Sequence, residues 1–525
     1  MSLQGASIVG LDCVRGDGPE AFGTNPSTGE QMQPAYAAVT IELTNEAVAK
    51  AAAAFPVYRK LSGALRGGFL RAIAAKIEAA GDALAERGPL ETGLPEGRFR
   101  METGRTCNQL RLFATIIEDG SWVDARIDAA QPDRQPIPKP DVRSMLQPIG
   151  PVAVFCASNF PLAFSVAGGD TASALAAGCP VVVKAHHSHP GVAEMVGLAV
   201  QAAAKETGMP DGVFSMLYGS GRTVGAALVQ HPDIRAVGFT GSHAGGRALM
   251  DLAAARPQPI PVYAEMGSLN PVFVLPGAMT DRGESIAEGL SGSVTLGAGQ
   301  FCTCPGMVVA ASNDATEQFT DQLALRQREA SPAVMLNTSI HEAYQKGTAA
   351  LDQHLGVEGI ASASTQNSGC QGDPALYITK AEDFIGDEAL AAEVFGPSTL
   401  LVTHNTREQL LQLAAQLEGH LTATVHATDA DLAEYGDLLD ILETKVGRLV
   451  INGYPTGVEV CHAMVHGGPY PATSDGRSTS VGTQAIFRFA RALAYQGYPD
   501  AILPDALKND NPLGIWRMVD GERAK

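Results

Sequence analysis

The strongest constraint on the fold is a regular alternation of strand-like and helix-like segments that begins near residue 150. Short apolar runs rich in β-branched residues lie at 152–157, 180–185, 213–218, 236–240, 261–264 and 271–275. Helical stretches separate the first four runs, and a further helix is expected at about 244–256. This alternation predicts a parallel sheet with crossover helices, a doubly wound nucleotide-binding type of domain. Ligands of such sheets bind at the carboxyl ends of the strands.

The segments on either side of this region are less regular. Residues 44–90 predict an amphipathic helix capped by Thr44 or Asn45, and a second helix is expected at roughly 98–118. Repeated prolines exclude a helix at 125–148 and leave an edge strand at 142–146, in a hairpin that pairs with another subunit. Residues 285–460 predict a second α/β region. Within it, 366–379 is expected to be a loop, and the tail beyond 484 to be helical and then loop-like.

Composition excludes several classes of protein. The chain has 525 residues, 45% of them hydrophobic, which is enough for a sizeable core. Its formal net charge of −19 argues against a general nucleic-acid binder, because such proteins need a positive surface. No apolar run approaches the roughly 20 residues needed to span a bilayer, and residues 1–10 lack a secretion signal. Eight scattered cysteines without paired C-x-x-C spacing indicate a reducing cytoplasm.

One glycine-rich turn is typical of phosphate binding. In the run Phe239-Thr-Gly-Ser-His-Ala-Gly245 a strand gives way to a helix, and glycine lets a phosphate approach the backbone N–H groups of the helix N-terminus. An ordinary strand-to-helix turn would have the same sequence. Gly241, Ser242 and Gly245 are therefore candidate cofactor-binding residues.

A basic strand end suggests which dinucleotide would bind. The run that starts at Lys184 carries no carboxylate of the kind that usually meets a free ribose 2′-hydroxyl. Lys184, His187 and Arg222 could instead form a positive pocket for a 2′-phosphate. Two alternatives stay open for the histidines at 186, 187 and 189, namely a zinc site and a solvated polar loop.

Cys302 is the strongest candidate for a reactive side chain. It follows a glycine-rich turn among small and polar residues, where a thiol can be accessible and nearby amides can lower its pKa. The alternatives are a buried structural thiol or a redox pair with Cys304. Glu265 and Glu393 are each either a structural acid or a general base with a raised pKa.

These pieces together resemble the aldehyde dehydrogenase superfamily. The matching segments, in family order, are Pro148-Ile-Gly-Pro-Val152, Ser158-Asn-Phe-Pro161, Val181-Val-Val-Lys184, Phe239-Thr-Gly-Ser242, Glu265-Met-Gly267, Gly299-Gln-Phe-Cys302 and Glu393-Val-Phe-Gly-Pro397. The C-terminal runs 466–475 and 511–516 resemble one branch of that superfamily. The branch contains α-ketoglutaric semialdehyde dehydrogenases and NADP-dependent fatty aldehyde dehydrogenases.

The resemblance implies an α/β fold of three parts. A Rossmann-like cofactor-binding domain would comprise residues 1–124 and 148–266, and a catalytic domain residues 267–465. Residues 125–147 and 466–525 would form a small oligomerisation segment and a C-terminal extension. A homodimer or homotetramer located in the cytoplasm is expected.

The resemblance also assigns roles to individual side chains. Cys302 would be the nucleophile, Asn159 would form the oxyanion hole with the backbone N–H of Cys302, and Glu265 would activate the hydrolytic water. The cofactor would bind to a second set: Lys184 and Glu393 at the two riboses, Gly241, Ser242 and Gly245 at the pyrophosphate, and Phe395 at the nicotinamide.

The substrate is the least determined part of this interpretation. The residues expected to line the pocket are Phe160, Phe164, Phe301, Arg105 and Gln109. Arg105, Gln109 and Arg111 lie on a helix that the family places near the substrate tunnel, and a dicarboxylic semialdehyde would need a cation for its far carboxylate. The resemblance predicts oxidation of α-ketoglutaric semialdehyde to 2-oxoglutarate, with NADP preferred, NAD possible and no metal.

Three alternatives to this reaction are open, one of substrate and two of function. A medium- or long-chain fatty aldehyde is the alternative substrate. A cofactor-free cysteine hydrolase is disfavoured by the set of Asn159, Lys184 and Glu393. A non-catalytic structural protein is disfavoured because Cys302 and Glu265 are both intact.

Overall fold

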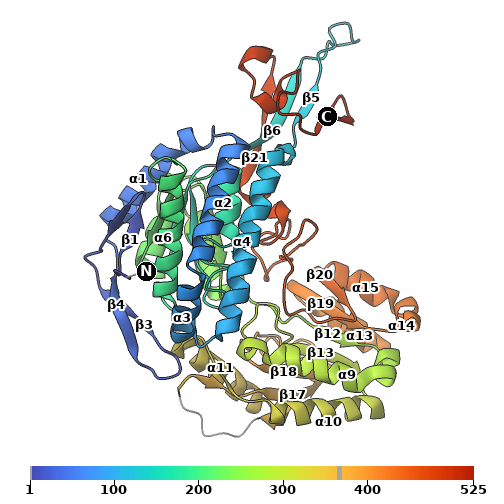
Figure 1. Cartoon of the computed structure of the whole chain (residues 1–525). Coiled ribbons are helices and arrows are strands. Elements are labelled where there is room, and N and C mark those ends of the chain that lie inside the picture. The colour runs from blue at the N-terminus through green and yellow to red at the C-terminus, as the bar shows by residue number, and fades with distance from the viewer. Residues whose placement is uncertain (1–2, 363–368) are drawn as a thin grey trace.

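Two seven-stranded sheets organise the chain, and Figure 1 shows them in separate lobes joined side by side. The computed structural model describes residues 3–362 and 369–525. In the first sheet the strands follow the order β11-β10-β7-β8-β9-β1-β2. The parallel strands are β7 (Val152–Phe155), β8 (Val181–Lys184), β9 (Phe214–Leu217), β10 (Ala236–Thr240) and β11 (Val262–Glu265). The short strands β1 (Ser7–Val9) and β2 (Asp12–Val14) extend it antiparallel. The predicted doubly wound alternation is thus present, except that the run at 271–275 belongs to the second sheet as β12 (Val272–Val274).

Crossover helices connect these strands. They are α5 (Gly169–Ala177), α6 (Pro190–Glu206), α7 (Ala226–Gln230) and α8 (His243–Ala254). Two N-terminal helices pack with α6 over one face of the sheet, where they close the largest apolar core of the chain (Figure 1). Because all crossovers run the same way, the carboxyl ends of β7, β8, β10 and β11 lie along one edge of the sheet.

The single helix predicted for 44–90 is three helices. They are α1 (Ile41–Tyr58), α2 (Gly63–Ala79) and α3 (Gly81–Thr92), and they are followed by α4 (Glu96–Asp119) where the second helix was expected. Thr40, rather than Thr44 or Asn45, caps α1 by accepting the N–H of Leu43, and Ser62 caps α2 in the same way. The apolar periodicity continues across both breaks, so periodicity alone does not reveal them.

The second sheet has the order β15-β17-β18-β13-β12-β19-β20 and is parallel except for β15. Its strands are β12 (Val272–Val274), β13 (Met307–Ala311), β15 (Val357–Ser362), β17 (Ala375–Lys380), β18 (Ser398–His404), β19 (His420–His426) and β20 (Val446–Ile451). The helices of this lobe are α9 (Pro276–Thr295), α10 (Asp314–Glu329), α11 (Thr338–Asp352), α12 (Ala381–Phe384), α13 (Arg407–Gln416), α14 (Asp429–Glu434) and α15 (Gly436–Glu443). The loop predicted at 366–379 is wrong for its last part, which is β17, while 366–368 lie outside the described residues.

A five-stranded sheet forms an arm that projects from the first lobe (Figure 1). Its order is β21 (Ala490–Gln496), β6 (Val142–Pro148), β5 (Arg126–Asp128), β22 (Arg517–Val519) and β23 (Glu522–Ala524). The predicted edge strand, β6, is therefore an interior strand, and the start of the predicted helical tail is β21. Both predictions failed for the same reason. The strands β6 and β21 pair with each other but lie far apart in the sequence, and no local sequence pattern indicates this pairing.

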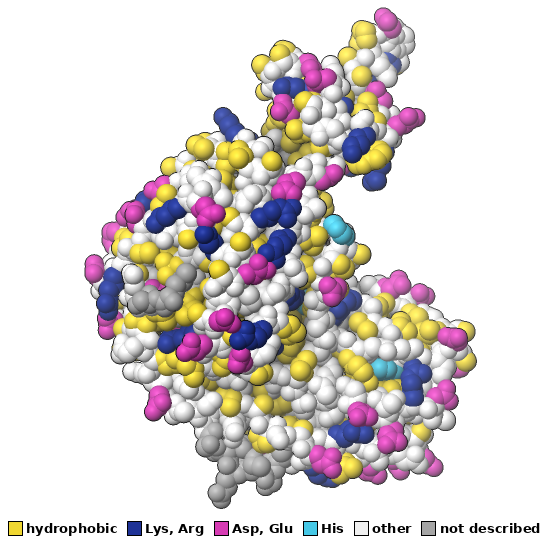
Figure 2. Space-filling model, viewed as in Figure 1, with side chains coloured by type: hydrophobic (Ala, Val, Ile, Leu, Met, Phe, Trp, Pro, Cys, Tyr) yellow, Lys and Arg dark blue, Asp and Glu magenta, His cyan; other side chains and the backbone are white. Residues whose placement is uncertain are grey.

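The surface carries both signs of charge. Figure 2 shows acidic and basic side chains interspersed over one face of the molecule. None of the helices in the described part of the chain is long and apolar enough to cross a membrane.

Candidate active site

Three reactive side chains from remote segments meet between the two sheets. Glu265 ends β11, Cys302 follows the turn Leu296–Gly299, and His466 lies in the irregular segment after β20. Nε2 of His466 lies 3.4 Å from Sγ of Cys302 and 2.9 Å from Oε1 of Glu265. Glu265 and His466 are buried, whereas Cys302 is partly accessible. The arrangement places a nucleophile, a proton acceptor and a carboxylate in one cluster.

Hydrogen bonds fix this cluster from two sides. Ser480 donates its hydroxyl to Oε2 of Glu265 at 2.6 Å. Asn270 donates its side-chain amide to the carbonyl oxygens of Cys302 and Cys304, both at 2.9 Å. Asn270 has a φ of 48°, in the left-handed region that asparagine tolerates better than most residues. Cys304 itself points elsewhere, toward the carbonyl oxygens of Val294 and Gly396.

The protonation states differ from those expected for Cys302 and Glu265. Burial and the nearby Glu265 carboxylate raise the pKa of the Cys302 thiol well above its ordinary value, so the expected lowering by amides is wrong. Burial alone would raise the pKa of Glu265, but His466 and Ser480 hold it below its ordinary value. The resting site therefore pairs a neutral thiol with an ionised carboxylate. A base must remove the thiol proton before the sulfur can attack.

The oxyanion candidate lies beside the nucleophile. Asn159 is buried and donates Nδ2 to the carbonyl oxygen of Gln300 at 3.1 Å, two residues before Cys302. Arg98 donates to the carbonyl oxygen of Asn159 at 3.2 Å and forms a buried ion pair with Glu102 at 3.3 Å. Glu102 also accepts two backbone N–H groups of the loop after Asn159. This network holds the carboxamide in one orientation.

A cavity of about 540 Å³ opens above Cys302. Phe160, Phe164, Phe301 and Arg105 line it, as do residues that the sequence did not single out: Arg98, Met101, Asn108 and the segment 457–460. Gln109 does not line it, contrary to expectation, but is buried against Gly169. Arg111 faces away and pairs with Glu78 of α2 at 2.5 Å.

The edge of the first sheet presents a phosphate cradle. Ser242 caps α8 by accepting the N–H of Gly245 at 3.2 Å, and the first turn of this helix is exposed. A Cβ added at Gly241 would lie 2.7 Å from the end of the Phe239 ring, so a larger residue here would displace that ring. Lys184 is buried at the end of β8, with no carboxylate within ion-pair distance in the described residues. These groups fit the phosphates and a ribose of a dinucleotide.

The expected basic pocket is weaker than predicted. The His187 ring stacks on His186, and burial of the ring together with the charge of Lys184 lowers the pKa of His187 to about 4. His187 is therefore neutral at pH 7 and adds no positive charge. Arg222 is exposed and lines a separate surface hollow with Ile41 and His231.

Two further predictions concern this edge. The three histidines at 186, 187 and 189 do not form a metal-ligand cluster in the described part of the chain, which leaves the zinc alternative without support. Glu393 accepts the N–H of Ser268 at 3.3 Å, and the close surroundings of its carboxyl raise its pKa to about 7. A Cβ at Gly267 would collide with this carboxyl, and Phe395 lies partly buried two residues on.

Sequence reasoning missed His466, Asn270 and Arg98. His466 stands at the start of the run 466–475, which resembles one branch of the family but carries no local sign of a catalytic histidine. Asn270 follows Glu265 by five residues and precedes a proline, a weak signal of a special backbone position. Arg98 lies seven residues before Arg105, on the same face of a helix, and this spacing could have linked the two.

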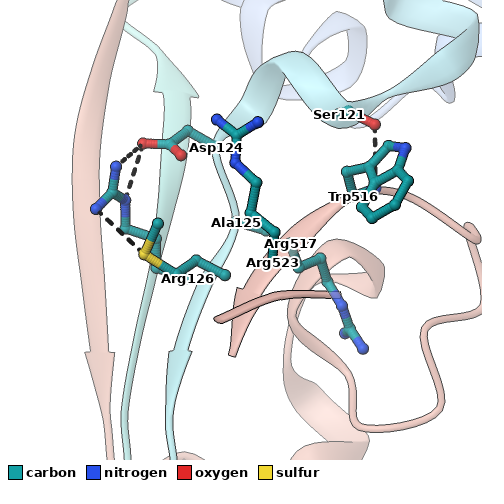
Figure 3. Close-up of a pocket in the computed structure, with 8 residues that line it drawn as sticks. Ser121, Asp124, Ala125, Arg126, Trp516, Arg517 and Arg523 are labelled. Atoms are coloured by element: carbon teal, nitrogen blue, oxygen red, sulfur yellow. Dashed lines mark hydrogen bonds and ion pairs between the residues drawn. The ribbon is translucent and has the colours of Figure 1, made fainter. Parts of the chain in front are cut away.

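A second hollow lies on the arm (Figure 3). It has a volume of about 430 Å³ and is lined by Trp516, Arg126, Arg523 and the turn at 121–125. Arg126 is paired with Asp124 at 2.9 Å, and the backbone N–H of Trp516 donates to Ser121. No cysteine, histidine or buried acid lines this hollow among the described residues, so it is not the candidate active site.

The comparisons with known proteins agree with the site. The model of the aldehyde dehydrogenase family matches residues 15–478, and the chain belongs to this family. It is an oxidoreductase that acts on aldehydes. The chain is 49% identical over 523 residues to α-ketoglutaric semialdehyde dehydrogenase 2 of Azospirillum brasilense, covering 99% of this chain and 100% of that protein. It is 45% identical to the α-ketoglutaric semialdehyde dehydrogenase of Acinetobacter baylyi, covering 98% of each.

The fold is shared with solved structures of lower identity. Betaine aldehyde dehydrogenase of Staphylococcus aureus in complex with NAD+ superposes with a TM-score of 0.81 at 20% identity, over 95% of this chain and 96% of that one. PnpE from Pseudomonas sp. WBC-3 superposes with a TM-score of 0.79 at 23% identity, over 94% and 97%. The predicted α/β aldehyde dehydrogenase fold is confirmed.

Proposed function

We propose that this enzyme oxidises α-ketoglutaric semialdehyde to 2-oxoglutarate, with NADP+ preferred and NAD+ as a second cofactor. The observation that carries the chemistry is the contact of His466 with both Cys302 and Glu265 beneath the cavity. The substrate comes from the two relatives named above, which align with almost the whole chain.

Attack by Cys302 begins with loss of the thiol proton. Nε2 of His466 lies 3.4 Å from Sγ and 2.9 Å from the Glu265 carboxylate, and this His466–Glu265 pair takes up the thiol proton. The sulfur then bonds to the aldehyde carbon, and the π electrons of the carbonyl move to its oxygen. Asn159 donates an N–H to that oxyanion, an interaction worth about 3–4 kcal/mol in the barrier.

The second half of the reaction is hydrolysis. Bound NAD(P)+ would supply the acceptor for the hydride that leaves the aldehyde carbon. Cys302 then holds the acyl group as a thioester. Glu265 removes a proton from water, the resulting hydroxide attacks the thioester carbon, and the C–S bond breaks to release the acid. The low pKa of Glu265 keeps it ionised for this step at neutral pH.

The remaining roles follow the two lobes. The unit built on the first sheet (1–124 and 148–266) would hold the dinucleotide, with Lys184 and Glu393 at its riboses, Phe395 at the nicotinamide, and Gly241, Ser242 and Gly245 at the pyrophosphate. Residues 267–465 would supply Cys302. Arg222 would contact the 2′-phosphate, although without help from a charged His187.

We propose that the arm, which contains residues 125–147 and the part of 466–525 from Ala490 onward, joins copies of the chain into a homodimer or homotetramer. His466 and Ser480, in the first part of the second segment, lie at the active site instead. The arm projects from the body (Figure 1). It exposes apolar side chains, among them Ile137 and Trp516. We place the enzyme in the cytoplasm, because all eight cysteines are free. Light scattering tests this assembly. The experiment compares the purified protein with a variant in which exposed apolar residues of the arm are changed to charged ones.

A kinetic panel tests the function. The substrates are α-ketoglutaric semialdehyde, succinic semialdehyde and hexanal, each with NADP+ and NAD+. The proposal expects the highest kcat/KM for α-ketoglutaric semialdehyde with NADP+. A clear preference for hexanal would instead assign the enzyme to the fatty aldehyde dehydrogenases, which the three phenylalanines of the cavity would suit.

A further inference from the structure

One arginine in the cavity above Cys302 has no partner for its charge. Three arginines line this cavity. Arg98 is paired with Glu102, and Arg100 with Asp82 and Glu96. Arg105 has no carboxylate within ion-pair distance in the described part of the chain, and its Nη1 is buried without a hydrogen-bond partner. The cavity therefore holds one uncompensated positive charge.

The head of Arg105 is held in place by neutral groups. Its guanidinium lies over the rings of Phe160 and Phe164, with centroid distances of 5.9 and 5.2 Å. Nη2 donates to the carbonyl oxygen of Val458 at 3.4 Å, on the opposite wall of the cavity. Both contacts orient the side chain without neutralising it. A buried guanidinium that lacks a partner is costly, and an anionic ligand would relieve that cost.

Arg105 is also electrostatically close to the reacting groups. Its charge opposes the rise in the pKa of the Cys302 thiol. Burial lowers the pKa of Arg105 itself, while the nearby Glu102, Cys302 and Glu265 favour its charged form. The one acidic side chain in the lining is Glu459, which is exposed and accepts the N–H of Val460. The two buried carboxylates near Arg105, Glu102 and Glu265, are paired with Arg98 and His466, so Arg105 is left to meet an anion inside the cavity.

We infer that Arg105 binds the far carboxylate of the substrate while Cys302 attacks its aldehyde carbon. The inference rests on the proposed function and adds to it the residue that selects an acidic aldehyde over a neutral one. In α-ketoglutaric semialdehyde four carbon–carbon bonds separate the two ends. Nη1 is the free donor, and the phenylalanines pack against the methylene groups between the ends.

The first test compares two aldehydes that differ only in the far carboxylate. Glutaric semialdehyde carries it, and pentanal has a methyl group instead. Arg105→Gln should lower kcat/KM for glutaric semialdehyde by about 10- to 150-fold, the value of one charge-assisted contact, with the loss in KM. The kcat/KM for pentanal should stay within a few-fold of the wild type. Arg105→Lys should recover part of the loss.

Arg111→Gln is the matched control. Arg111 lies on the same helix, but its ion pair with Glu78 faces away from the cavity. This variant should leave both aldehydes unaffected. An equal loss on both aldehydes in Arg105→Gln would mean that Arg105 only holds Val458 and the aromatic rings, and would overturn the inference.

The second test uses an unreactive anion. 2-Oxopentanoate has the carbon skeleton of the substrate with a methyl group where the aldehyde is. It should inhibit pentanal oxidation competitively, and Arg105→Gln should weaken this inhibition by the same 10- to 150-fold. Unchanged inhibition would contradict the inference.

The two proposals can fail separately. A wild-type enzyme that prefers glutaric semialdehyde to pentanal, but turns over α-ketoglutaric semialdehyde poorly, would disprove the proposed substrate and support the Arg105 subsite. A wild-type enzyme that does not distinguish glutaric semialdehyde from pentanal would disprove the subsite.

Discussion

The edge of the first sheet and the cavity above Cys302 are built in different ways. The edge uses local elements: a cap at Ser242, a glycine that avoids the Phe239 ring, and Lys184 at the end of its own strand. The cavity joins side chains from segments that are remote in sequence, with His466 in contact with Cys302 and Glu265. Backbone groups dominate at the edge, and buried, mutually dependent side chains dominate in the cavity.

This difference indicates where a substitution should lower the enzyme's activity most. Changes at the edge remove one contact with a ligand and leave the rest in place. Changes in the cavity also alter the protonation of the neighbours, because burial and proximity couple their pKa values.

The largest effect is expected at the nucleophile. Cys302→Ala should abolish dehydrogenase turnover because no other group can form the thioester, while dinucleotide binding at the separate edge persists. NAD(P)H formation and cofactor titration by fluorescence measure the two properties. Cys304→Ala should retain most activity, since its sulfur faces Val294 and Gly396. Equal loss in both variants would point to a redox pair.

Removal of the carboxylate should separate the two halves of the reaction. Glu265→Gln should release one burst of NAD(P)H and then stall as the thioester, with steady-state turnover lowered by about 10²- to 10⁴-fold. Rapid-mixing absorbance shows the burst, and intact-protein mass spectrometry shows the acylated chain. Absence of a burst would assign Glu265 to a step before hydride departure.

The coupling within the cavity predicts a change in pH dependence. His466 helps to hold the pKa of Glu265 below its ordinary value, so His466→Asn should let that pKa rise. Glu265 then becomes protonated at a higher pH than in the wild type. The acidic limb of the profile of kcat against pH should therefore move to higher pH. At neutral pH the loss should be about 100-fold, because the His466–Glu265 pair that takes up the thiol proton is also broken.

His354→Asn provides the control for this profile. His354 is paired with Asp387 near the surface of the second lobe at 2.9 Å, away from the cavity. Its profile should match the wild type. A His466→Asn profile that is lower but unshifted would show that His466 only packs against its neighbours.

The smallest effect is expected at the edge and on one cofactor only. Arg222→Ala should raise the KM for NADP+ by about 10- to 150-fold and leave that for NAD+ nearly unchanged. Lys184→Met should weaken both cofactors alike, as a ribose ligand would. Steady-state kinetics at saturating aldehyde measure these constants. Equal effects of Arg222→Ala on both cofactors, or a wild-type preference for NAD+, would remove the 2′-phosphate contact from the proposal.

Much of the fold could be predicted because its signals are local. Each parallel strand of the first sheet is a short β-branched run between helices, and the turn at Gly241 follows from glycine spacing. The arm could not be predicted, because β6 acquires its partner β21 from the other end of the chain. The sequence also could not show which face of α4 points into the cavity. Arg105 lines the cavity, whereas Gln109 and Arg111 on the same helix do not.

The sequence by itself determined the family of the protein, the identity of Cys302 and Glu265 as candidates, and the strand ends at which a cofactor is expected to bind. These depend on residue types at fixed spacing, which are readable without coordinates. Only the tertiary structure decided that His466 completes the site, that the thiol of Cys302 has a raised pKa, and that Arg105 is left without a partner. Those properties arise from burial and from distances between remote segments, and folding alone sets both.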